Sequence, residues 1–143
     1  MKTSSLTFLL ILLFCFQGNG QSSDSLKFKS LFPADFNLQL QKEEKAILID
    51  VREFFEYRKS RLKDAVNIPS SGNLEVTADT INKDNALFFY CTSGFRSKRV
   101  AKFFYNKGFP KVYSLEGGIV AWRKNKMPVD KKRHKTHHAR HTD

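Results

Sequence analysis

The sequence of 143 residues contains only two cysteines, and one of them lies in its first, apolar segment. Cys15 belongs to that segment and Cys91 to the middle of the chain. If the segment is removed, Cys91 stands alone and no internal disulfide can form. A dithiol oxidoreductase needs a second, resolving thiol. The cysteine count therefore favours single-thiol chemistry, with intermolecular pairing as the alternative.

Histidine is absent until the last ten residues, which hold His134, His137, His138 and His141. A domain without histidine excludes Cys-His nucleophilic pairs, zinc proteolysis and histidine general bases. We expect residues 130–143 to be a disordered, solvated tail. The alternative is that the histidines, spaced along one helical face, collect a metal ion, which removal by EDTA would reveal. We expect no metal site elsewhere.

Long apolar runs are also lacking. The longest, residues 6–16, has eleven residues and one threonine, whereas a membrane-spanning helix needs about 20. Lys2 precedes this run and a small-x-small pattern, residues 18–20, follows it. These features predict a signal peptide over residues 1–20, a secreted or periplasmic protein, and no transmembrane segment after cleavage.

The alternatives to a cleaved leader are two kinds of anchor. The run could hold the chain in a membrane, or Cys15 could carry a lipid. Lipoprotein processing requires a small residue before the cysteine, and Phe14 is bulky. We therefore favour cleavage, followed by a short linker over residues 21–25 and one domain over residues 26–129.

Acidic residues are few: 14 stand against 25 lysines and arginines, so the formal charge is +11. A basic surface raises the local concentration of anions. The chain has no aromatic stacking motif at a basic patch, and we expect no nucleic-acid partner. The charge favours small anionic substrates.

The stretch with the most candidate functional residues lies around Cys91. Residues 87–90 are apolar or aromatic and predict a buried strand, and an apolar pattern with helical spacing starts just after Ser97. Cys91 thus follows a strand and precedes a helix, whose free N–H groups and dipole stabilise an anion. Gly94 lets the loop curl so that its N–H groups point inward, and Arg96 adds a permanent charge. Together they predict a reactive thiolate.

The alternative is that Cys91 is a small buried hydrophobe at a strand end. We favour reactivity because two hydroxyl residues, Thr92 and Ser93, a glycine and an arginine follow it.

The other segments alternate between strand and helix patterns. Helices are expected over residues 33–42, 52–59, 74–81 and 119–123, and strands over residues 46–49 and 111–115. This alternation predicts an α/β fold, with a central parallel sheet of about five strands and helices on both faces. Trp122 is expected in the core.

Asp50 and Arg52 follow the strand over residues 46–49. The carboxyl ends of parallel strands share one edge of a sheet, so both residues should lie near Cys91 and support its loop. A helix-capping role for Asp50 is equally consistent with its position.

The loop at residues 91–97 resembles the active-site loop of rhodanese-like domains, which has a cysteine, a polar stretch with a glycine, then a basic residue and a serine or threonine. The strand and turn over residues 48–53, the strand over 65–69, and Gly117-Gly118 with Trp122 resemble further motifs of that family, in the same order. The chain departs from the family pattern at residues 60–62, where it has Ser-Arg-Leu and family members often have Gly-His-Ile.

The resemblance implies a sulfurtransferase in which Cys91 takes sulfur from a thiosulfate-like donor and passes it, as a persulfide, to cyanide or a thiol. It implies no cofactor. Cys91 and Arg96 would be the catalytic residues. The anion-binding loop would be formed by Thr92, Ser93, Gly94, Phe95 and Ser97.

Two alternatives stay open. Phosphatases and arsenate reductases related to this family have a similar loop, but theirs has one more residue than the four between Cys91 and Arg96. A non-catalytic sulfur carrier or binding module is the second alternative. Phe95 is bulky for the family and points to an unusual acceptor.

Overall fold

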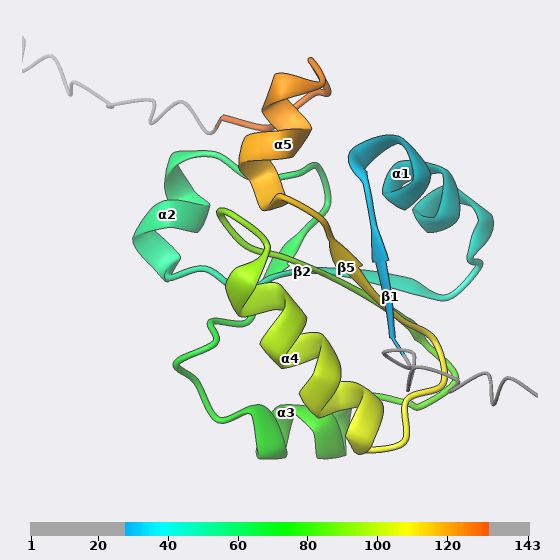
Figure 1. Cartoon of the computed structure of the whole chain (residues 1–143). Helices are drawn as coiled ribbons and strands as arrows, with labels where there is room; N and C mark the ends of the chain where they lie inside the picture. The colour runs from blue at the N-terminus through cyan, green and yellow to red at the C-terminus, as the bar shows by residue number, and fades with distance from the viewer. Residues whose placement is uncertain (1–27, 132–143) are drawn as a thin grey trace, which may run out of the picture.

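Every residue of strand β4 (Ala86–Tyr90) is buried in the structure, a computed structural model that describes residues 28–131. The remaining elements surround this strand (Figure 1). In chain order they are β1 (Lys29–Leu31), α1 (Pro33–Lys42), β2 (Ala46–Asp50), α2 (Phe54–Lys59), β3 (Val66–Asn67), α3 (Leu74–Thr80), β4, α4 (Phe95–Asn106), β5 (Val112–Leu115) and α5 (Gly118–Lys124).

The five strands form one parallel sheet in the order β1-β5-β4-β2-β3. Strand β4 lies between β5 and β2, and its partner across from Tyr90 is Asp50. The carboxyl ends of β2 and β4 therefore lie side by side. The predicted α/β fold, with a parallel sheet of about five strands and helices on both faces, is confirmed.

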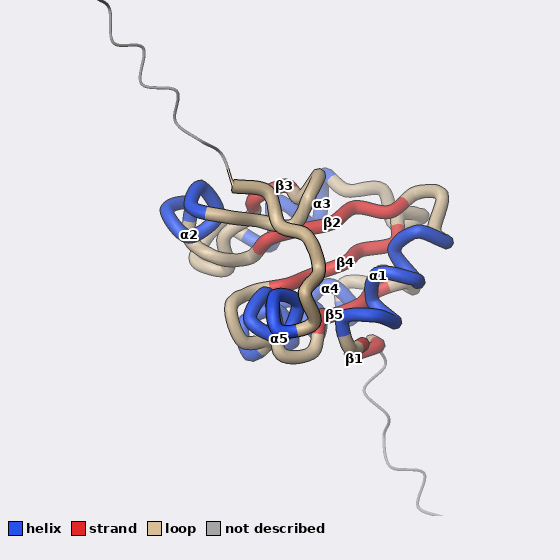
Figure 2. Tube along the Cα trace, turned by 90° about the horizontal axis from the view of Figure 1, so that it is seen from above, coloured by secondary structure: helices blue, strands red, loops and turns tan. Residues whose placement is uncertain are grey.

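The side chains of β4 alternate between two cores. Leu87 and Phe89 pack on one face with residues of α3 and α4, including Phe104. On the other face, Phe88 and Tyr90 pack with residues of α1 and α5. Figure 2 shows α1 and α5 on this second side of the sheet. Such two-sided burial explains why residues 87–90 form a continuous apolar run.

Trp122 lies in the second core, as predicted. It is 4% exposed, and its indole N–H donates to the Pro128 carbonyl at 2.8 Å. The polar end of the ring thus has a partner despite its burial, which the low polarity of the core requires.

Several elements differ from the sequence-based expectation: α2 begins at Phe54 rather than at residue 52, and β3 has only two of the residues 65–69. Strand β1 was not expected, because only one of its three residues is apolar; it forms by pairing with β5 at the sheet edge. Helix α4 begins at Phe95, before the predicted start after Ser97, because Gly94 takes a left-handed conformation and serves as its N-cap. Arg96 and Ser97 are therefore residues of the first helical turn.

The predicted signal peptide, the linker over residues 21–25 and the histidines of the tail lie outside the described residues. Asp130, assigned to the tail from the sequence, pairs with Arg61 through two backbone hydrogen bonds of 2.8 and 3.0 Å. This pairing joins residue 130 to the segment that follows α2. Within residues 28–131, no helix has the length and apolarity needed to cross a bilayer.

Candidate active site

The loop that follows β4 curls around the sulfur of Cys91. The N–H of Gly94 points at Sγ, with a nitrogen-to-sulfur distance of 3.1 Å. This geometry depends on the positive φ of Gly94, +93°, which a side chain would strain. One of the loop N–H groups that were expected to point inward therefore contacts the sulfur.

Helix α5 holds the outer side of the same loop. The N–H groups of Ile119 and Val120 donate to the carbonyls of Cys91 and Thr92, at 2.9 and 3.2 Å. Gly118 allows this approach, since a Cβ on it would lie only 2.4 Å from the Cys91 oxygen. These two hydrogen bonds tie the start of the loop to the first turn of α5.

Cys91 is more deeply buried than the expectation of a reactive thiol implied. The residue is 1% exposed and packs in the same core as Phe89 and Val100. It is therefore both the buried residue at a strand end that the alternative described and the centre of a polar loop. A substrate must pass between the loop residues, or move them, before it touches Sγ.

A carboxylate lies over the loop and binds Arg96. The two guanidinium NH groups donate to the two oxygens of Glu56, at 3.0 and 3.1 Å, and one also donates to the Thr92 hydroxyl at 3.0 Å. That hydroxyl in turn donates to Glu56 at 2.8 Å. Arg96 does reach the loop, as predicted, but its charge is shared with a residue of α2.

This cluster shifts the pKa of both charged groups. The hydrogen bond from Arg96, aided by one from Thr92, lowers the pKa of Glu56 from 4.5 to about 2 against the opposing effect of burial. The hydrogen bond to Glu56 raises the pKa of Arg96. Both groups are therefore charged at neutral pH.

A pH series is expected to reveal this ion pair. Because the pKa of Glu56 is about 2 in the folded protein and ordinarily 4.5, the unfolded state binds protons first as the pH falls. The wild type should be more stable than Glu56→Gln at neutral pH, and its advantage should shrink as the pH falls from about 5 towards 2. Urea unfolding of both proteins across this range measures the difference. An advantage that did not change with pH would contradict the assignment.

The other loop residues have different surroundings. Ser97 is fully buried; its hydroxyl donates to the Gly94 carbonyl at 3.1 Å and accepts from Ser114 at 3.0 Å. This residue supports the loop from beneath. Ser93 is exposed, and Phe95 is 69% exposed on the outer surface of the loop. Thr92, by contrast, faces Glu56 and Arg96.

Asp50 and Arg52 form a buried ion pair at the neighbouring strand end. Arg52 donates to both carboxylate oxygens of Asp50, the shortest contact being 2.5 Å, and to the Ser60 carbonyl at 2.7 Å. Burial alone would lower the pKa of Arg52, but its hydrogen bonds to Asp50 and the charge of Asp50 raise it.

This pair binds the turn around α2 rather than the loop at residues 91–97. Asp50 accepts from the N–H of Arg52, while the N-cap of α2 is Glu53. Residues 60–62 differ from the family pattern, but this turn is still bound to β4, since the Leu62 N–H donates to the Tyr90 hydroxyl at 3.1 Å. Asp50 and Arg52 thus support the segment that carries Glu56.

Sequence reasoning missed Glu56, because its partner Arg96 lies 40 residues away. The signal that could have identified it is a carboxylate in the helix after β2, close to the strand end that adjoins Cys91. No group of three or more metal-binding side chains is found in the described part of the chain.

The chain is similar in sequence to proteins of known name. A protein from Bacillus subtilis named "Putative sulfurtransferase YtwF" is 33% identical over 103 residues, which are 72% of this chain and 98% of that protein. The tRNA uridine(34) hydroxylase of Hamiltonella defensa is 28% identical over 64% of this chain, which spans only 28% of that enzyme.

Among solved structures, a rhodanese-related protein from Thermoplasma volcanium superposes with a TM-score of 0.64 at 28% identity, covering 73% of this chain and 100% of that one. The family model described as Rhodanese-like domain matches residues 33–125. The chain therefore belongs to the rhodanese-like domain family.

Proposed function

We propose that the protein is a sulfurtransferase that uses Cys91 as its nucleophile. The Cys91 thiolate attacks the outer sulfur of a thiosulfate-like donor, the donor's sulfur–sulfur bond breaks, and sulfite leaves with the electron pair. Cyanide or a thiolate then attacks the outer sulfur of the Cys91 persulfide. The products are thiocyanate or an acceptor persulfide, and Cys91 is released as a thiolate.

The observation that carries this proposal is the 3.1 Å contact between the Gly94 N–H and Sγ. A fixed amide donor at this position stabilises negative charge on sulfur in the thiolate and again when Cys91 leaves the persulfide. The first turn of α4 adds the positive end of its dipole on the same side. The sulfurtransferase name of the Bacillus subtilis relative supports the same chemistry.

Arg96 and Glu56 give the donor its path to the buried sulfur. An anion that binds Arg96 competes with the Glu56 carboxylate for the same guanidinium, since Glu56 uses both of its NH groups. We therefore expect anion binding to loosen this ion pair and to open the loop towards Cys91. Phosphate chemistry is less favoured, because a loop with four residues between Cys91 and Arg96 leaves less room for a tetrahedral oxyanion.

Parallel assays with the purified domain test this choice. We expect thiocyanate to form from thiosulfate and cyanide, and an aryl phosphate to be hydrolysed far more slowly. Cys91-dependent phosphatase turnover well above sulfur transfer would overturn the assignment. A gain of sulfur on Cys91 without thiocyanate would instead identify a sulfur carrier.

We also propose that the mature protein is secreted or periplasmic, on the basis of the apolar run at residues 6–16. Expression of the full chain and fractionation of the cells, followed by N-terminal sequencing, tests this. A mature N-terminus at Gln21 is expected. An intact N-terminus in the cytoplasmic fraction would contradict the proposal.

A further inference from the structure

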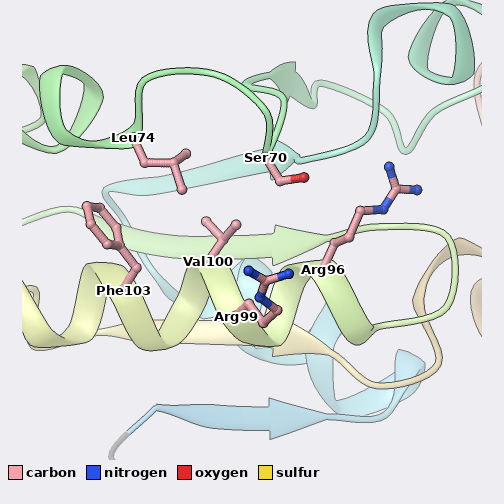
Figure 3. A pocket seen from close by; sticks show the side chains of 6 residues that line it. All are labelled: Ser70, Leu74, Arg96, Arg99, Val100 and Phe103. Atoms are coloured by element: carbon pink, nitrogen blue, oxygen red, sulfur yellow. The ribbon is translucent and has the colours of Figure 1, made fainter.

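A groove runs along α4, beside the loop that holds Cys91. It has a volume of about 220 Å³ and is lined by Ser70, Leu74, Arg96, Arg99, Val100 and Phe103. Figure 3 shows Ser70 and Leu74 on one side of the groove and the residues of α4 on the other, with Arg96 at one end and Phe103 at the other. Arg96 and Phe103 are seven positions apart in α4, which corresponds to a rise of about 10 Å along the helix.

The groove has an apolar floor and one cation available to a ligand. Val100 is buried, and Leu74 and Phe103 are partly buried. Arg96 is already bound to Glu56, whereas Arg99 is exposed and has no hydrogen-bond or ion-pair partner among the described residues. A ligand that satisfies both features needs an apolar stem and an anionic group, such as a carboxylate, that pairs with a guanidinium.

The size of the groove limits the ligand to a small molecule. Pockets for drug-sized ligands range from about 300 to 1,000 Å³, and a stable protein interface buries at least about 1,000 Å². At 220 Å³, this groove suits a stem of only a few carbons. The groove ends at Arg96, whose guanidinium contacts Thr92 of the active-site loop, so one end of such a ligand lies next to that loop.

We propose that this groove binds the sulfur acceptor, a small thiol that carries a carboxylate on a short apolar stem. Arg99 binds the carboxylate, Val100 and Ser70 contact the stem, and the thiol end extends past Arg96 towards the loop. The acceptor thiolate attacks the outer sulfur of the Cys91 persulfide, the bond to Cys91 breaks, and the acceptor leaves as a persulfide. This inference rests on the proposed sulfur transfer for its chemistry, but the binding step does not require it.

Arg99→Ala tests the acceptor site in the transfer reaction. The KM for mercaptopropionate should rise about three- to tenfold, the loss of one partly screened charge contact, while the KM for the neutral mercaptopropanol stays unchanged. Arg99→Lys should recover part of the loss. Lys102→Ala, which removes an exposed charge of α4 outside the groove, is the matched control. Equal effects of Arg99→Ala and Lys102→Ala, or equal effects on both thiols, would overturn the proposal.

A second measurement separates this site from the proposed function. Butyrate has the same stem and carboxylate but no thiol, so its binding does not depend on sulfur transfer. Titration with butyrate should shift the methyl NMR signals of Val100 in the wild type and much less in Arg99→Ala. Absence of these shifts in the wild type would refute the groove, whatever the persulfide result. Shifts without any persulfide would refute the sulfurtransferase and retain the groove.

Discussion

Replacing Cys91 by serine is expected to lower the rate of thiocyanate formation from thiosulfate and cyanide at least about 10³-fold. A serine hydroxyl is not ionised at neutral pH and cannot form the persulfide, so the covalent step is lost. The substitution changes one atom in a site that is 1% exposed, and the Gly94 N–H keeps an acceptor. We therefore expect the fold to persist.

The urea midpoint of Cys91→Ser should lie close to that of the wild type, which shows that lost activity does not reflect unfolding. Measuring both quantities on one preparation is sufficient. Equal rates of thiocyanate formation in the two proteins would mean that another group transfers the sulfur, and the role assigned to Cys91 would be wrong.

Gly118→Ala is expected to disturb the loop from the side of α5. Gly118 has a φ of +59°, and a Cβ on it would lie 2.4 and 2.5 Å from the backbone oxygens of Cys91 and Thr92. A left-handed alanine costs roughly 1–2 kcal/mol, and a clash with main-chain atoms in a packed site adds about 1–3 kcal/mol. We expect a loss of about 2–5 kcal/mol in unfolding free energy, measured by urea denaturation.

Activity should fall as well, since the two oxygens belong to the loop that orients Sγ. A displacement of about 1 Å in such a site can cost about 10²-fold in rate. Gly72→Ala is the matched control, because Gly72 lies in an exposed turn without a left-handed φ, and a Cβ on it would lie 3.1 Å from the Pro69 carbonyl oxygen, against 2.4 Å for the closest contact at Gly118. If Gly118→Ala behaved like Gly72→Ala, the close contact between α5 and the loop would not exist in solution.

The parts of the fold that were predicted from the sequence are those fixed by local patterns. Residues 46–49 and 87–90 are short apolar runs typical of strands buried on both faces, and α4 has an apolar stripe with helical spacing. Gly94 marked the turn after Cys91 because only glycine adopts its backbone conformation without strain. The position of Cys91 at the end of β4 followed directly.

What could not be predicted depends on contacts between distant segments. Strand β1 forms by pairing with the edge of β5, and its own three residues show no strand pattern. The bonds of Glu56 to Arg96 require α2 and α4 to meet, and the depth of Cys91 depends on how α5 packs on the loop. Asp50 and Arg52 were placed at the correct edge of the sheet, but their mutual ion pair directs them to the turn before α2.

These contacts change the description of the site more than that of the fold. The sequence alone leads one to expect that Arg96 is a free cation beside an accessible thiol. In the structure, the arginine is neutralised by Glu56 and the thiol lies beneath the loop. Entry of the donor therefore becomes part of the reaction, and the groove along α4 offers the acceptor a separate approach.

The most direct test of this account is intact-protein mass spectrometry after incubation with thiosulfate and removal of the excess. We expect a gain of one sulfur atom, mapped to the peptide that contains Cys91 and lost again on addition of cyanide. An unchanged mass under conditions in which the protein is folded, or a sulfur that remains after cyanide, would contradict it.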